Sequence, residues 1–362
     1  MGLNVTAGTA EHRGTPDPAV MEPLARILFG HAAFQYLNAG CELGLFDLLA
    51  DRGPLEKREI GPALSLEGRA ADILLLGCTS LGLLGKSGER YALGDAIRSL
   101  LDAGDWQRFK DTVAFEQHIV YEAQADFTES LRENSNVGLR RISGQGRDLY
   151  HRLAGHPRLE RVFYRYMRSW SELANEHLTD ALREIGVERV LDCGGGDAVN
   201  ALALARSLPG VQVTVLEIAN SVPVTEKQII NSGAGDRVRV VPCDMFADAF
   251  PGGHDCVLFA HQLVIWTPQE NVLLLRKAYE ALPPGGHVVI FNSMSDDTGD
   301  GPVVAALDSV YFASLPAEGG MIYSWAQHEE ALREAGFAEP RRVTCPGWTP
   351  HGLIIATKQP PR

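Results

Sequence analysis

Short apolar runs alternate with segments of helical spacing after Gly186, and this alternation constrains the fold more than any other feature of the sequence. Continuous Val and Leu runs, in place of strict apolar–polar alternation, are typical of parallel strands covered on both faces. The spacing suits βαβ units, so we predict an α/β fold with a doubly wound, mostly parallel sheet. The strands are expected at 189–193, 212–218, 238–244, 255–261 and 286–292, with a terminal antiparallel pair within 340–358.

The first half of the chain has helical spacing and little strand signal. A small hairpin is expected around 86–91, and with the helices before it this layout resembles a winged helix. In the later helices Met167 and Ser171 share a face, because they are four residues apart. Four segments are therefore expected: a disordered tail rich in Gly, Thr and Pro (1–20), a winged-helix-like module (21–105), further helices (106–184) and the sheet domain (185–362).

The charge of the chain excludes some classes of partner. The 362 residues have a formal net charge of −13, which opposes binding to nucleic acid or to an anionic membrane. The winged module is therefore expected to serve packing or dimerisation, and a transcription regulator is the weakest of the functions considered. The six cysteines are far apart in sequence, which is typical of reduced thiols in a cytoplasmic protein.

A glycine run follows the first predicted strand, in the segment DCGGGDAVN. The strand ends at Asp192, and Gly194 and Gly196 would let a ligand approach the backbone at a helix start. A dinucleotide fingerprint needs a third glycine where this chain has Val199. The run therefore favours a nucleoside cofactor without a pyrophosphate.

Acidic residues end the next two predicted strands. Glu217 is placed to accept both ribose hydroxyls of an adenosine, and Asp244, beside Met245 and Phe246, could bind an adenine amino group. Each acid alone is weak evidence. In a doubly wound sheet, however, ligands bind outside the carboxyl ends of the strands, where all these groups are expected to meet.

These segments, together with CELGLFDLL, LGLLGK, FYRYM, CDMF, ALPPGG and REAGF, resemble the S-adenosylmethionine-dependent small-molecule methyltransferases related to caffeic-acid and acetylserotonin O-methyltransferases. The resemblance implies a class I methyltransferase domain, S-adenosyl-L-methionine as cofactor, a homodimer formed by the N-terminal module, and acceptor-pocket helices within 106–184. The expected cofactor contacts are Met167, Ser171, Asp192, Gly194, Gly196, Glu217, Ile218, Asp244, Met245 and Ala260.

The segment AHQLVIWTPQ departs from that family. Aligned on Trp266, the position of the family's catalytic histidine holds Val264, and the two bracing glutamates fall at Asn292 and Ile322. Some anthracycline-type relatives lack the histidine in the same way. His261 is expected to be either a relocated base or a wall of the pocket.

Other candidate residues come from the helical segments. His118 is a second candidate base, with an ordinary helix-surface histidine as the alternative, and His328 is expected at the surface. No metal site is expected. The acceptor pocket is expected to include Val264, Asn292, Tyr311, Phe312 and Tyr323, with Met321 and Trp325 as further candidates.

The expected activity is methylation of a small hydroxylated aromatic metabolite in specialised biosynthesis. O-methylation comes first, driven by proximity of donor and acceptor in place of a base. The alternatives are methylation of a carbon next to a phenol, and a homologue that binds the cofactor but performs another reaction, such as hydroxylation or rearrangement.

Overall fold

The computed structural model describes residues 16–360, which fall into two compact units divided after Gly104. The tail expected over 1–20 lies outside the described residues, except for its last five. Of these, Pro18 to Val20 begin the first helix.

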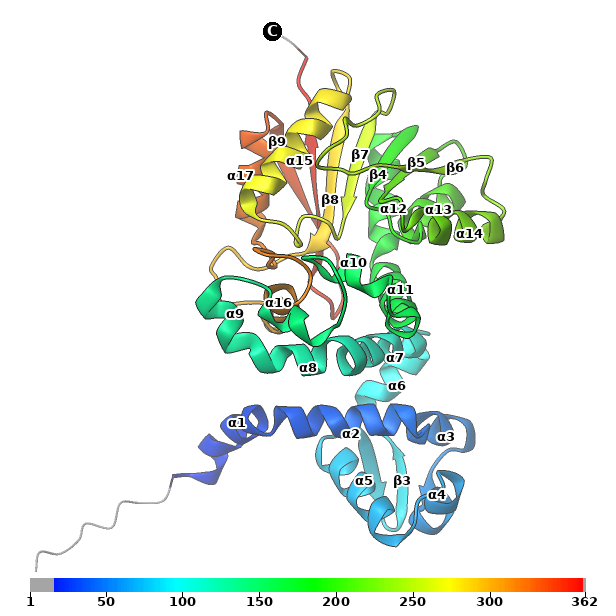
Figure 1. The fold of residues 1–362 in the computed structure, drawn as a ribbon. Coiled ribbons are helices and arrows are strands. Elements are labelled where there is room, and N and C mark those ends of the chain that lie inside the picture. Colours follow the sequence, from blue (N-terminus) through cyan, green and yellow to red (C-terminus); the bar gives the residue numbers. More distant parts are fainter. Residues whose placement is uncertain (1–15, 361–362) are drawn as a thin grey trace, which may run out of the picture. The chain divides into compact units, whose positions relative to one another are not determined.

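The N-terminal unit is a helical module with a small three-stranded sheet (Figure 1). Its strands are antiparallel in the order β1-β3-β2, and the β2–β3 hairpin occupies the expected position, with Ser87 opposite Arg90. This confirms the winged-helix-like layout. The elements are α1 (Pro18–Leu28), α2 (Gly30–Glu42), α3 (Leu45–Arg52), β1 (Leu55–Glu56), α4 (Lys57–Ala63), α5 (Gly68–Ser80), β2 (Leu84–Ser87), β3 (Arg90–Leu93) and α6 (Asp95–Asp102).

The second unit begins with helices that precede the sheet in sequence. An aromatic cluster forms its core here: the Phe115 and Tyr166 rings stack with centroids 3.8 Å apart, and Tyr311 packs edge-on against Phe115 at 5.0 Å. The elements are α7 (Trp106–Phe115), the π-helical turn η1 (Glu116–Val120), α8 (Tyr121–Ala123), η2 (Gln124–Asp126), α9 (Phe127–Glu133), η3 (Val137–Arg141), α10 (Leu149–Leu153), α11 (Pro157–Glu172) and α12 (Asn175–Ile185).

The sheet of the second unit has seven strands in the order β6-β5-β4-β7-β8-β10-β9. All five predicted parallel strands are present, and β10 runs antiparallel to both of its neighbours. The elements are β4 (Arg189–Cys193), α13 (Val199–Ser207), β5 (Gln212–Glu217), α14 (Val222–Ser232), β6 (Val238–Pro242), β7 (Cys256–Ala260), α15 (Pro268–Ala281), β8 (His287–Ser293), α16 (Val303–Ser314), α17 (Trp325–Glu334), β9 (Ala338–Thr344) and β10 (His351–Thr357).

Helices cover both faces of this sheet (Figure 1). Side chains alternate along each strand, so Val190 packs toward α12 and α13 while Leu191 packs toward α15 and α17. The doubly wound α/β fold is thereby confirmed.

The helix after β7 begins at the Thr267–Pro268 pair. Thr267 Oγ1 accepts a hydrogen bond from the backbone N–H of Glu270, and the Glu270 carboxylate accepts one from the N–H of Thr267. This capping box fixes where α15 starts. It therefore also fixes the length of the loop between β7 and α15.

Candidate functional site

The strand order reverses between β4 and β7 in the middle of the sheet. The chain passes from β4 outward to β5 and β6, and then returns to the other side of β4 at β7. Such a reversal leaves a crevice at the carboxyl ends of the two strands, where ligands bind in open α/β sheets. Gly194 follows β4 and Gln262 follows β7, and Gln262 Nε2 donates a hydrogen bond to the Gly194 carbonyl oxygen across 2.9 Å.

The glycine loop after β4 needs glycine for steric and conformational reasons. Gly194 and Gly196 have φ of 69° and 59°, in the left-handed region that favours glycine. A Cβ on Gly194 would lie 2.5 Å from the Gln262 side chain, and one on Gly195 would lie 2.5 Å from the Asp192 carboxylate. A Cβ on Gly196 would meet nothing within 4 Å. The loop therefore packs tightly on its inner side and leaves open space at Gly196.

Glu217, at the end of β5, is held against this loop. Its carboxylate accepts hydrogen bonds from the Gly196 N–H at 3.0 Å and the Ile218 N–H at 2.7 Å. Burial raises the pKa of Glu217, although both hydrogen bonds act in the opposite direction. A carboxylate fixed in this way faces the cavity with its other lone pairs, and these can accept hydrogen bonds from ribose hydroxyls.

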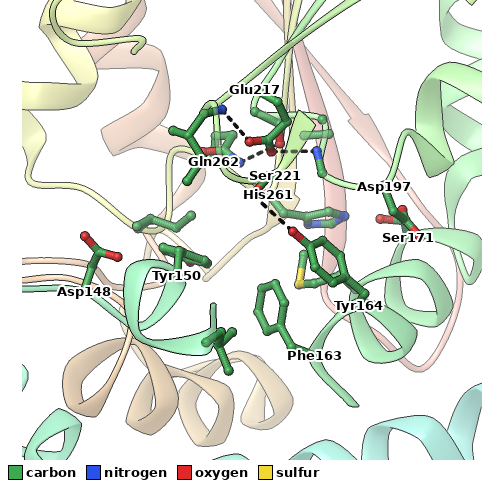
Figure 2. A pocket seen from close by; sticks show the side chains of 18 of the residues that line it. Asp148, Tyr150, Phe163, Tyr164, Ser171, Asp197, Glu217, Ser221, His261 and Gln262 are labelled. Atoms are coloured by element: carbon green, nitrogen blue, oxygen red, sulfur yellow. Dashed lines mark hydrogen bonds between the residues drawn. The ribbon is translucent and has the colours of Figure 1, made fainter. Parts of the chain in front are cut away.

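A cavity opens beside the glycine loop, between the strand ends and helices α10, α11 and α16 (Figure 2). Twelve of the expected site residues line it: Met167, Ser171, Gly194, Gly196, Glu217, Ile218, Met245, Ala260, His261, Val264, Tyr311 and Phe312. The structure thus brings together residues that lie up to 145 positions apart, from Met167 to Phe312.

Two expected site residues are buried beneath the cavity instead of lining it. Asp192 is fully buried under Gly195, and neither of its carboxylate oxygens has a hydrogen-bond partner among the described residues. Burial raises the pKa of Asp192 to about 7, and the neighbouring charge of Glu217 adds to the shift. Asn292 is also fully buried, and alternation along β8 gives the lining position to Ser293. The structure therefore places Asn292 outside the cavity lining.

Tyr323 and Asp244 are occupied with local backbone contacts. The Tyr323 hydroxyl donates to the Trp266 carbonyl oxygen at 2.6 Å, which places Tyr323 behind the loop after β7 and not in the acceptor wall. Asp244 is exposed, and its Oδ1 accepts hydrogen bonds from the N–H groups of Phe246 and Ala247. Neither residue lines the cavity, so no cavity contact supports the expected roles.

Four further candidates also lie away from the cavity lining. His118 lies in the π-helical turn η1, and Met321 and Trp325 are outside the lining as well. His328, expected at the surface, is buried, with 2% of its surface exposed. The expectation for His328 is therefore wrong, because α17 packs this side of its first turn against Tyr323 at a ring-centroid distance of 5.7 Å.

His261 lies at the cavity in an unusual backbone conformation. Its φ is 57°, and its N–H donates to the Phe291 carbonyl oxygen across 2.8 Å. The imidazole packs against the rings of Phe291 and His351, with centroids 4.9 and 5.3 Å away. Burial lowers the pKa of His261 to about 4, and its Nε2 has no partner among the described residues. At neutral pH the ring is uncharged, and no carboxylate within residues 16–360 braces it.

Val264, the position where the sequence resemblance puts a catalytic histidine, makes the loop after β7 apolar. It is buried and packs with Ile265 and Ala317 against Phe312. The Asn271 side chain holds this loop by donating from Nδ2 to the Leu263 carbonyl oxygen at 2.9 Å. The loop after β7 can therefore shape the cavity and exclude water from it, but residue 264 supplies no proton acceptor.

An aromatic wall formed by α10 and α11 was not predicted from the sequence. Its rings are those of Tyr150, Phe163, Tyr164, Tyr166 and Trp170. Figure 2 shows Phe163 and Tyr164 reaching toward the strand ends, where the Tyr164 hydroxyl donates to Ser221 Oγ at 3.2 Å. Helical spacing does not separate rings of this kind from ordinary core.

Four carboxylates of the cavity were not predicted from the sequence: Asp148, Glu160, Asp197 and Asp308. The lining contains Asp148, Glu160, Asp197, Glu217 and Asp308, and no lysine or arginine within residues 16–360. Asp197 directly follows the glycine run, which was a readable signal, and its Oδ2 accepts from Arg168 Nη2 at 2.6 Å. Within the same residues, no three His, Cys, Asp or Glu side chains are grouped so as to hold a metal ion. A cavity of this charge suits a cationic ligand such as a sulfonium.

Two family models match the chain. An O-methyltransferase domain covers residues 121–338, and an O-methyltransferase dimerisation domain covers residues 25–102. No helix within the described part of the chain has both the length and the apolar character needed to cross a membrane.

Individual proteins agree with these models. The L-tyrosine C(3)-methyltransferase of Streptomyces lavendulae is 61% identical over 360 residues, 98% of each chain. The 3-hydroxy-5-methyl-1-naphthoate 3-O-methyltransferase of Streptomyces sahachiroi is 30% identical, over 95% of this chain and 98% of the relative.

Solved structures give the same fold. The S-adenosylmethionine-dependent methyltransferase SibL superposes with a TM-score of 0.84 at 50% identity, covering 94% of this chain and all of the other. Human N-acetylserotonin methyltransferase, solved with its cofactor, superposes with a TM-score of 0.81 at 21% identity, over 96% of this chain and all of the other.

Proposed function

Because the chain belongs to the O-methyltransferase family and is an S-adenosylmethionine-dependent methyltransferase, we propose that it methylates a ring carbon of a phenolic amino acid related to tyrosine. The observation that carries this proposal is the 61% identity, over 98% of each chain, to an L-tyrosine C(3)-methyltransferase. The aromatic wall of the cavity is consistent with a planar acceptor.

The glycine loop and its neighbours fit S-adenosyl-L-methionine. The space at Gly196 admits a ligand close to the backbone, and Glu217 supplies an acceptor for ribose hydroxyls. Met167, Ser171, Ile218 and Met245 are proposed to complete this half of the cavity. The cofactor supplies an electrophilic methyl group on a positively charged sulfur.

Carbon methylation places modest demands on the protein. The phenol hydroxyl pushes electron density into the ring as it gives up its proton, and the adjacent ring carbon forms a bond to the methyl group as the carbon–sulfur bond breaks. The ring carbon then loses its own hydrogen while the oxygen regains one. One proton is released overall, and no metal or redox partner is required.

The cavity contributes mainly by positioning. Holding donor and acceptor at near-attack distance is worth up to ~7–11 kcal/mol, whereas a general base typically adds ~10²–10⁴-fold. Val264 and Phe312 form an apolar wall that excludes water from the reacting atoms. His261, the candidate base, is uncharged at neutral pH, but its lowered pKa makes it a weak proton acceptor. Proximity therefore remains our proposed main source of rate.

The 3-O-methyltransferase relative and the family model favour O-methylation, the outcome expected first from the sequence, as a second candidate. One experiment separates the two. The enzyme is incubated with S-adenosyl-L-methionine and L-tyrosine carrying deuterium at both ring carbons adjacent to the hydroxyl, and the product is examined by mass spectrometry. We expect a methylated product that has lost one deuterium.

A methylated product that keeps both deuterium atoms would establish O-methylation instead. If S-adenosylhomocysteine does not accumulate with L-tyrosine, the proposed acceptor class is wrong. Boiled enzyme with the same mixture controls for exchange of ring deuterium with water.

A homodimer is proposed from the matched dimerisation domain. Helix α1 supports it, because this helix has no buried residue although it exposes Val20, Met21, Leu24, Ile27 and Leu28. Apolar surface of this extent on one helix is typical of an interface.

A further inference from the structure

One carboxylate of the cavity has no explanation in the proposed methyl transfer. Asp197 is paired with Arg168, Asp148 with His151, and Glu217 with two backbone N–H groups. Glu160 lies in the first turn of α11, where the helix dipole favours an acid. Asp308 of α16 is the remaining acid of this lining, and none of these contacts accounts for it.

Asp308 is partly buried and lines the cavity. Within residues 16–360 its side chain accepts no hydrogen bond and forms no ion pair, and burial raises its pKa to about 7. An unpaired acid in such a place costs free energy in the empty protein, since nothing replaces the water that its charged form has lost. An acid in this state favours binding of a group that can donate to it.

A second, partly buried acid lies near enough to Asp308 to be affected by its charge. Glu116, at the start of the π-helical turn η1, has its pKa raised to about 8 by burial and by the nearby charge of Asp308. π-Helical turns are often found at functional sites, because the extra residue redirects the side chains that follow. Two acids in reach of one another repel when both are charged, so a cation near them stabilises both.

The surroundings of the pair suit an organic cation. Tyr166 and Tyr311 lie close enough to Asp308 for its charge to raise their pKa values. Aromatic rings stabilise an ammonium group at their faces. No lysine or arginine in the described lining competes for the acids.

We propose that Asp308, assisted by Glu116, binds an ammonium group of the acceptor. The acceptor is then an amine or an amino acid, and not a neutral phenol. This inference rests on the proposed function in that it assigns one end of the proposed phenolic amino acid. The phenol ring would lie against the aromatic wall, with its ammonium group at α16.

The test compares two ligands of nearly equal shape, tyramine and 4-propylphenol, which differ by an ammonium in place of a methyl group. Each is titrated calorimetrically into the dimeric enzyme saturated with S-adenosylhomocysteine, so no methyl transfer is needed. We expect the unmodified enzyme to bind tyramine at least 10-fold more tightly, as for a charge-assisted hydrogen bond. Asp308→Asn should reduce that preference to less than about 3-fold while leaving the affinity for 4-propylphenol unchanged.

Two variants complete the design. Glu116→Gln should lower the preference for tyramine in the same direction. Asp236→Asn removes the same charge from an exposed acid of the same unit and should leave the preference intact. Thermal unfolding of each variant identifies any that fails to fold, and Glu116→Gln then replaces Asp308→Asn as the deciding variant.

Equal binding of the two ligands by the unmodified enzyme overturns the proposal. A tyramine preference that survives in a folded Asp308→Asn variant also overturns it, as does equal weakening of both ligands. If instead the binding preference depends on Asp308 but deuterated tyrosine keeps both ring deuterium atoms, the ammonium site stands and the proposed carbon methylation fails.

Discussion

Gln262 Nε2 donates a hydrogen bond to the carbonyl oxygen of Gly194, and this contact links the loops that follow β4 and β7 at the reversal of strand order. The same glutamine fills the space that a side chain on Gly194 would need. The position of the glycine loop therefore depends on a residue that follows a different strand.

Gln262→Ala is expected to weaken binding of S-adenosylhomocysteine by roughly 2- to 10-fold, since a net hydrogen bond is worth about 0.5–1.5 kcal/mol. Gly194→Ala should weaken it further, because the left-handed φ adds about 1–3 kcal/mol of strain for a residue with a side chain. Calorimetric titration measures both. The double variant should bind better than Gly194→Ala alone, because the clash is removed and the strain is not. If the double variant binds S-adenosylhomocysteine no better than Gly194→Ala does, the clash with the Gln262 side chain is unimportant.

The loop and the sheet were predictable because their signals are local. A glycine run directly after an apolar strand, and an acid at the end of the next strand, depend on neighbours in the sequence, and the structure brings Gly194, Gly196 and Glu217 together as expected. The fold class followed from the alternation of strands and helices in the same way.

The acceptor half of the cavity depends on packing between distant segments. Tyr150 and Asp308 line one space although 158 residues separate them, and nothing local distinguishes them from core or surface residues. Alternation along β8 turns Asn292 away from the cavity lining. The Tyr323 hydroxyl donates to the Trp266 carbonyl oxygen, and Tyr323 does not line the cavity. His328 shows the same limit, since the start of a capped helix is usually exposed and here it packs inward.

Acid should destabilise the protein through its buried histidines. Burial lowers the pKa of His328 to about 4, so between pH 6.5 and 4 the unfolded chain binds a proton that the folded one does not. The contribution of the neutral histidine to the free energy of unfolding is fully present above pH 6.5. It falls as pH decreases through this window, by ~1.4 kcal/mol per pH unit for each such group. His328→Gln should flatten the decline in unfolding temperature, whereas His31→Gln at an exposed position should not. Identical slopes for all three proteins would show that His328 does not contribute.

The dimer should depend on α1. Introducing Leu24→Asp and Ile27→Asp places charge on residues that are 56% and 77% exposed in the single chain. If these residues are buried against a second copy, the mass measured by light scattering should fall to that of a monomer, because burying each aliphatic side chain is worth ~1.5–3 kcal/mol. Ile230→Asp, at a 76% exposed position on α14, is the matched control and should leave the dimer intact. A dimer that survives the α1 changes must be formed by another surface.

Val264 holds the position where the sequence resemblance puts a catalytic base, so we expect Val264→His to shift the products. An imidazole at this position could take the hydroxyl proton while oxygen attacks, which favours the O-methylated product over the ring-methylated one. The larger side chain must fit against Ile265 and Phe312, and overpacking of this kind costs ~1–3 kcal/mol. Val264→Leu controls for bulk without a proton acceptor. With ring-deuterated tyrosine, mass spectrometry should detect more product with both deuterium atoms for Val264→His than for Val264→Leu. Equal product ratios in the two variants would mean that an absent base at residue 264 does not select carbon over oxygen.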